Sequence, residues 1–170
     1  MKKVIAIALI LCCLLALCAC GKEELALYIL PGEQVGENLS ATELGSHAKK
    51  QGRLALKGED FAGVDWEKQL FALRPEAVPS VSTLTAESGG SSLLKTTDKD
   101  VFVWVLGGKA LYYGGFKMGI SNPDTPKDMR LSDKERYMFS IDHISGKDRR
   151  FDKNLYKWFY NHGLIKSELN

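Results

Sequence analysis

The sequence predicts an α+β fold, with a mainly antiparallel sheet around a central hairpin and one or two helices, including one at the C-terminus. Residues 100–117 hold two apolar runs joined by Gly107-Gly108, a two-residue hairpin signal. Residues 152–164 carry the start signal, apolar face and terminal glycine of a helix. Strand-like segments outnumber helical ones, which favours an antiparallel sheet over alternating parallel units.

The first elements alternate between strand and helix. Residues 25–30 are apolar throughout and end at Pro31-Gly32, which indicates a buried strand and a turn. The next segment, "SATELGSHAKKQG", predicts a helix that begins after Ser40, with Glu43 completing a capping box and Gly52 as its stop. Residues 53–58 alternate and predict a second strand.

The middle of the chain is less regular. Residues 64–75, "VDWEKQLFALRP", are interpreted as one strand because Trp66 and Phe71 suit a pleated face and Pro75 ends the run. Residues 75–92 are rich in Ser, Pro, Gly and Thr and predict a loop.

The hairpin strand of residues 100–106 is apolar on both of its faces, which predicts a central position in the sheet. The return strand runs from Lys109 to about Phe116, and Gly114-Gly115 within it predicts a bulge or a close backbone approach.

The C-terminal third is predicted as a loop, a strand and a helix. Residues 121–135 are polar and contain two prolines, whereas residues 136–145 alternate as a strand does. In the final helix Asp152 is the expected N-cap, and Phe151 and Tyr156 fit a hydrophobic staple. Gly163 fits the position after the helix end. His162 is interpreted as a capping or half-buried structural residue.

The chain start has the pattern of an export signal. Two lysines precede residues 4–19, a run of 16 residues without charge or proline, whereas a spanning helix needs roughly 20. The sequence "LCAC" before Gly21 resembles the lipobox of bacterial lipoproteins. The resemblance implies cleavage after Ala19 and acylation of Cys20, with palmitate or a similar chain, at the extracytoplasmic face of the cell membrane. Cys18 is the rival site and follows the bulky Leu17; the other alternative is an uncleaved membrane anchor.

This interpretation divides the chain into a signal peptide (1–19), a short lipidated tether (20–24) and a single α+β domain (25–170). All four cysteines lie within the first 20 residues, so the mature domain has no disulfide. Removing 19 of 170 residues leaves 151, with 23 − 2 = 21 basic against 21 acidic side chains. A net charge of zero gives no support for a nucleic-acid partner.

No motif for a cofactor, a metal or a catalytic residue is recognised. The chain lacks a phosphate-binding loop, a Gly-x-Ser-x-Gly elbow and a His-Glu-x-x-His pair. Asp65 and Glu67 flank Trp66 and are weak acid–base candidates, since on one strand they would share a face. The alternative is a solvated face opposite a core tryptophan. His143 is a third candidate, although its neighbour Asp142 would point to the opposite face.

Aromatic side chains crowd the predicted hairpin: Trp104, Tyr112, Tyr113 and Phe116. They either fill a core covered on both faces, which continuous apolar strands favour, or expose a platform for a peptide or glycan.

The phrases "EDFAGVDWEKQLFAL", "VFVWVLGGKALYYGGF" and "DKNLYKWFYNHGLI" resemble a group of small bacterial envelope lipoproteins of uncharacterised function. The resemblance covers residues 58–165, implies one compact domain and assigns no catalytic residue. The leading hypothesis is therefore an anchored binding or accessory module with an envelope protein or glycan as partner, rather than an enzyme. The alternatives are an envelope hydrolase using Asp65, Glu67 or His143, and an inhibitor or immunity-like protein.

Overall fold

The computed structural model describes residues 23–35, 39–77, 93–94, 96–97, 99–116, 129–134, 137–144 and 147–169. It confirms an α+β fold with a mainly antiparallel sheet and a C-terminal helix. The strands of the described residues are β1 (Leu25–Pro31), β2 (Arg53–Lys57), β3 (Phe61–Asp65), β4 (Leu70–Leu73), β5 (Asp100–Leu106), β6 (Lys109–Phe116), β7 (Met129–Asp133), β8 (Met138–His143) and β9 (Ile165–Lys166). The helices are α2 (Ala41–Gln51) and α3 (Lys153–Asn161), with single 3₁₀ turns η1 (Gly32–Gln34), η2 (Gly58–Asp60) and η3 (Pro75–Ala77).

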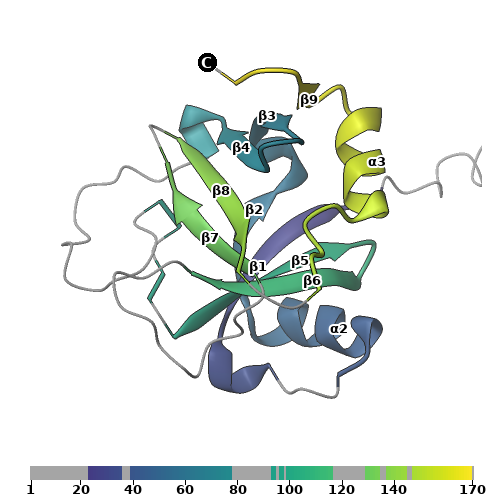
Figure 1. Cartoon of the computed structure of the whole chain (residues 1–170). Helices are drawn as coiled ribbons and strands as arrows, with labels where there is room; N and C mark the ends of the chain where they lie inside the picture. Colours follow the sequence, from purple (N-terminus) through teal and green to yellow (C-terminus); the bar gives the residue numbers. More distant parts are fainter. Residues whose placement is uncertain are drawn as a thin grey trace, which may run out of the picture.

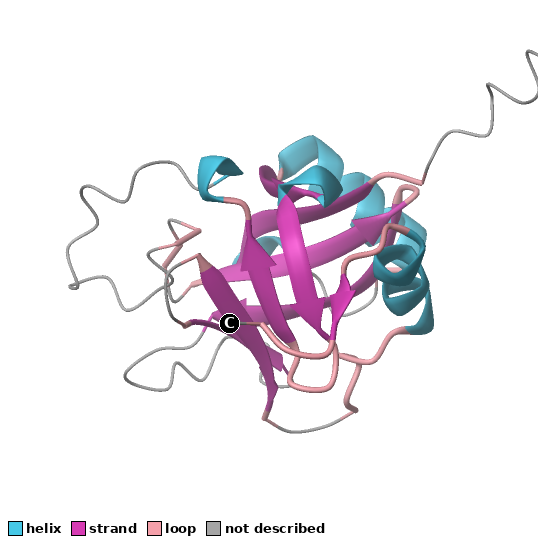
Figure 2. Ribbon diagram, turned by 90° about the horizontal axis from the view of Figure 1, so that it is seen from above, coloured by secondary structure: helices cyan, strands magenta, loops and turns pink. Residues whose placement is uncertain are grey.

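The described strands form one hydrogen-bonded order, β2-β1-β5-β6-β7-β8-β4-β3-β9. Only the β6–β7 and β3–β9 pairs are parallel. The sheet bends so strongly that its two halves, β2-β1-β5-β6 and β7-β8-β4-β3, enclose a shared interior (Figure 1). Seen from above, the helices lie at the periphery of the strands (Figure 2).

The interior holds the main hydrophobic core, to which both halves of the sheet contribute. Trp104 of β5 lies 5.6 Å from Phe61 of β3 and 5.7 Å from Phe71 of β4, between ring centroids. Helix α3 adds Leu155 and Phe159 to this core. A second, smaller core lies on the outer side of β1, β5 and β6, where α2 packs. Strand β5 is therefore covered on both faces, as its sequence predicts.

The predicted hairpin is confirmed. Gly107 and Gly108 both adopt positive φ, +56° and +87°, as a tight turn between twisted strands requires. The predicted irregularity lies elsewhere, because the register shifts between Trp104 and Val105 and makes Leu111 the extra residue. Of the two alternatives for Gly114-Gly115, the bulge is wrong, since this pair is in regular register with β5, whereas a close backbone approach stays a prediction.

Two predicted elements are corrected. Residues 64–75 form two strands, β3 and β4, rather than one, because the chain turns at residues 66–69. The Asp65 carboxylate accepts a hydrogen bond from the Lys68 N–H at 3.1 Å and stabilises this turn. The turn contains no glycine or proline, the residues that usually predict a turn from sequence. Residues 129–133, expected within a loop, form β7 because their backbone pairs with β6 on one side and β8 on the other.

Both predicted helices are confirmed with their end signals. Ser40 and Glu43 form a reciprocal capping box, and these hydrogen bonds lower the pKa of Glu43. Asp152 caps α3 by accepting the Asn154 and Leu155 N–H groups at 2.8 and 3.0 Å. At the other end of α3, Gly163 (φ +67°) closes the helix in a Schellman arrangement.

The two residues of the predicted staple at the start of α3 are connected through a third aromatic ring. Phe151 and Tyr156 both make edge-to-face contacts with Trp66, at centroid distances of 6.1 and 5.3 Å. The turn between β3 and β4 therefore supplies the ring that holds the start of the helix.

The residues of the predicted signal peptide, Cys20, most of the 75–92 loop and residues 117–128 lie outside the described residues. Within the part of the chain that the structure describes, no helix has the length and apolar character needed to cross a membrane.

Candidate functional site

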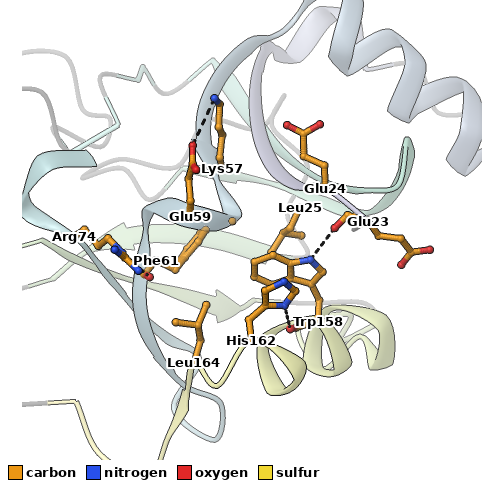
Figure 3. Close-up of a pocket in the computed structure, with 11 residues that line it drawn as sticks. Glu23, Glu24, Leu25, Lys57, Glu59, Phe61, Arg74, Trp158, His162 and Leu164 are labelled. Atoms are coloured by element: carbon orange, nitrogen blue, oxygen red, sulfur yellow. Dashed lines mark hydrogen bonds and ion pairs between the residues drawn. The ribbon is translucent and has the colours of Figure 1, made fainter. Parts of the chain in front are cut away.

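A pocket of about 450 Å³ opens between the start of the described chain, η2 and α3 (Figure 3). Its lining comes from residues 23–25, 57–61 and 158–164, together with Arg74. The pocket lies beside the start of β1, and Glu23 and Glu24 of the predicted tether line it.

Trp158 of α3 forms one wall of the pocket. Its indole Nε1 donates a 2.8 Å hydrogen bond to the main-chain carbonyl of Glu23, which ties the residues just before β1 to the helix. Gly58 lies against the ring, because a Cβ atom there would be only 2.3 Å from the indole Cη2. A glycine is therefore required at the first position of η2 for the tryptophan to occupy this place.

His162 lies face to face with Trp158, with ring centroids 3.8 Å apart and planes 19° apart (Figure 3). Its Nδ1 donates to the Trp158 carbonyl at 2.7 Å, since a carbonyl oxygen can only accept. In the neutral imidazole this leaves Nε2 as an acceptor. The predicted structural role is confirmed, because His162 is the C-cap residue of α3.

The rest of the pocket combines a polar rim with an apolar floor. Leu25, Phe61 and Leu164 supply the apolar side chains, and Glu59 supplies a carboxylate. Glu23 and Glu24 also line the pocket, but the Glu23 carboxylate lies beside Gly107 of the hairpin turn. The cations are Lys57, whose ammonium lies 3.7 Å from the Glu59 carboxylate, and Arg74, whose Nε donates to the Phe61 carbonyl. A carboxylate and an imidazole acceptor beside apolar carbon suit a ligand that presents hydroxyl or amino donors on a compact carbon framework.

The predicted carboxylate pair does not form. Asp65 is the last residue of β3 and is only 2% exposed, whereas Glu67 lies exposed in the following turn. They share no strand face, because the chain leaves the strand at Trp66. The alternative of a solvated face is also wrong for Asp65, whose carboxylate lies 3.2 Å from the Lys68 ammonium and supports the turn.

His143 ends β8, opposite Met129 of β7. Neither it nor Asp65 or Glu67 lines the pocket. Among the described residues, no group of three His, Cys, Asp or Glu side chains is placed to hold a metal ion. The pocket therefore does not bring the three acid–base candidates together, as a hydrolase mechanism that used them there would require.

The predicted aromatic platform belongs to the core. Trp104, Tyr112 and Phe116 are at most 1% exposed, and Tyr113 is half-buried against the smaller core under α2. Burial also raises the pKa of the Tyr112 phenol far above its usual range. The hairpin therefore exposes no aromatic platform, because α2 covers one of its faces and the opposite half of the sheet covers the other.

The exposed aromatic side chains lie instead around α3. Phe151, Tyr156 and Tyr160 are 48%, 39% and 64% exposed. Their exposure is not evident from the sequence, where Phe151 and Tyr156 fit a staple. The four-residue spacing of Trp158 and His162 places both rings on one side of a helix, but it does not show that a pocket opens beside them.

Comparison with known proteins identifies no relative: no family model, no curated protein and no solved structure matches this chain.

Proposed function

We propose that this chain is a lipoprotein, anchored through Cys20 at the extracytoplasmic face of a bacterial membrane, and that its pocket binds a hydroxyl-bearing envelope ligand of the glycan class. The observation that carries the proposal is the hydrogen bond from Trp158 to Glu23. It fixes the start of the domain against the pocket wall, three residues after the cysteine that the lipobox pattern selects.

The few residues between Cys20 and Glu23 limit how far the pocket can lie from the membrane. Three residues span at most about 11 Å when extended, so an acylated Cys20 holds the pocket close to the membrane surface. A ligand recognised there would be a surface-bound or membrane-proximal molecule. Binding is favoured over hydrolysis because the pocket offers hydrogen-bond acceptors and an apolar floor, while Asp65, Glu67 and His143 lie outside it.

Cys20→Ser is expected to abolish lipid attachment and to leave the unprocessed precursor, because serine offers no thiol to acylate. The matched control is Cys18→Ser, which removes the neighbouring thiol and should leave both steps intact. Labelling cells with an alkyne fatty acid, followed by immunoprecipitation, measures the outcome. Label retained in the Cys20→Ser protein, or lost in the Cys18→Ser protein, would overturn the assignment of the anchor.

The pocket is tested by calorimetric titration of the detergent-solubilised lipoprotein with a soluble peptidoglycan disaccharide. His162→Ala removes the imidazole acceptor, and Glu59→Gln replaces the carboxylate by a weaker, neutral acceptor. Each variant is expected to raise the Kd for the disaccharide about two- to tenfold, the effect of one lost hydrogen bond. Glu76→Gln, a similar change in the exposed η3 turn outside the pocket, is expected to leave Kd unchanged. Equal affinities in all four proteins, or no binding by the wild-type protein, would contradict the ligand assignment.

A further inference from the structure

Aromatic and basic side chains form an exposed surface around α3. We use "the α3 face" for six residues: Trp66, Phe151, Lys153, Tyr156, Lys157 and Tyr160. Trp66 makes edge-to-face contacts with Phe151 and Tyr156, and Tyr156 stacks on Tyr160 at a centroid distance of 6.0 Å. The aromatic rings therefore form a contiguous group, and three of them are exposed by more than a third of their surface.

The α3 face is also positively charged. Residues 147–161 contain five Lys or Arg and two Asp, a net charge of +3 in a mature chain whose net charge is zero. Helix α3 itself contains two lysines and no acidic residue. Arg150 pairs with Asp148 at 2.7 Å and lies 5.4 Å from the Phe151 ring centroid, which adds a cation beside the aromatic group.

The α3 face adjoins the start of the domain. Leu155 and Phe159 point into the core, and Trp158, on one flank of the helix, holds Glu23. Tyr156 and Tyr160 lie on the other flank, with Lys153 and Lys157 between the flanks on the side away from the core. A helix is about 10–12 Å wide with its side chains, which matches the reach of the three-residue tether from Cys20.

We propose that the α3 face rests on an anionic phospholipid surface, with its tyrosines and Trp66 at the level of the headgroups and its lysines on the phosphates. The inference rests on the lipid anchor of the proposed function, which would hold the helix at this surface. Trp and Tyr are the side chains that favour the membrane–water interface, and clustered cations are attracted to anionic headgroups. The combination of these side chains with a tether of this length favours a bilayer over a protein partner.

The test uses the full lipidated protein in vesicles of phosphatidylglycerol and brominated phosphatidylcholine. The bromine atoms lie near the top of the acyl chains of the phosphatidylcholine and quench the fluorescence of nearby tryptophans. The chain has three tryptophans: Trp66 and Trp158 lie on opposite flanks of α3, and Trp104 is fully buried.

We expect the brominated lipid to quench the tryptophan emission of the wild-type protein. Lys153→Glu combined with Lys157→Glu should reduce it roughly twofold or more, since reversed charges repel anionic headgroups. Lys49→Glu combined with Lys50→Glu, the same change at the exposed end of α2, should not reduce it.

Vesicle flotation separates the two proposals. A protein that fails to float is not lipid-anchored, which overturns the proposed function together with this inference. Floating protein whose tryptophans are not quenched, or whose quenching is equal in both double variants, overturns the inference alone; the first of these results would leave a protein partner as the occupant of the α3 face. Quenching that depends on Lys153 and Lys157 supports a membrane-bound helix.

Discussion

Trp104→Ala is expected to lower the free energy of unfolding by about 3–5 kcal/mol, the usual cost of removing a buried large aromatic side chain. Trp104 is fully buried and its ring contacts Phe61, Phe71 and Phe159, which belong to three other elements. The indole thus connects both halves of the sheet and α3, and no single neighbour can move to fill the space that it leaves.

Urea unfolding of the solubilised protein, followed by circular dichroism, measures this loss. The matched control is Tyr160→Ala, which removes an aromatic ring that is 64% exposed and is expected to change stability by no more than about 0.5 kcal/mol. If Trp104 served as an exposed binding platform, the difference would disappear: Trp104→Ala would fold as stably as Tyr160→Ala and lose only a ligand. Equal stability of the two variants would contradict the core described above.

Gly45→Ala is expected to destabilise the domain by about 1–3 kcal/mol, although the same change stabilises an exposed helix by about 1 kcal/mol. The reason is the close approach of α2 to the hairpin turn. A Cβ atom at Gly45 would lie 2.3 Å from the Gly108 carbonyl oxygen and 2.9 Å from the Ala110 nitrogen. Both are backbone atoms, one in the hairpin turn and one in β6, so the helix itself has to move away from the hairpin.

Ser46→Ala, at the next and exposed position of α2, provides the control. It is expected to leave stability unchanged or to raise it by up to about 0.5 kcal/mol, according to helix propensity alone. Thermal unfolding of the two variants side by side tests the packing. A Gly45→Ala protein as stable as the Ser46→Ala protein would show that α2 does not sit on the hairpin as closely as the structure has it.

The elements that could be predicted are those whose signals are local. The Gly107-Gly108 turn, the capping box at Ser40 and Glu43, and the end of α3 at Gly163 each depend on a few neighbouring residues, and the structure has all of them. The continuous apolar run of β5 also predicts its central place, because a strand with two apolar faces has to be covered twice.

The missed elements depend on contacts between distant segments. The turn after Asp65 forms around a buried carboxylate and carries no glycine or proline, so its sequence could also be that of a strand. Strand β7 exists because two other strands supply its hydrogen bonds. Neither property can be recognised from the residues of the segment itself.

The candidate site shows the same limit. The sequence shows many aromatic residues in the hairpin, but it does not show which rings are covered, since this depends on where α2 and the opposite half of the sheet pack. The contact of Trp158 with Glu23 joins residues 135 positions apart, and the need for Gly58 beneath the indole appears only once that contact exists.

The most direct test of the account is mass spectrometry of the N-terminal peptide of the protein purified from its own membranes. We expect a peptide that begins at Cys20 and carries a diacylglyceryl group on the cysteine sulfur. A peptide that begins at Cys18, an unmodified Cys20, or an intact chain that still begins at Met1 would contradict the anchor, and with it the placement of the pocket and α3 at the membrane surface.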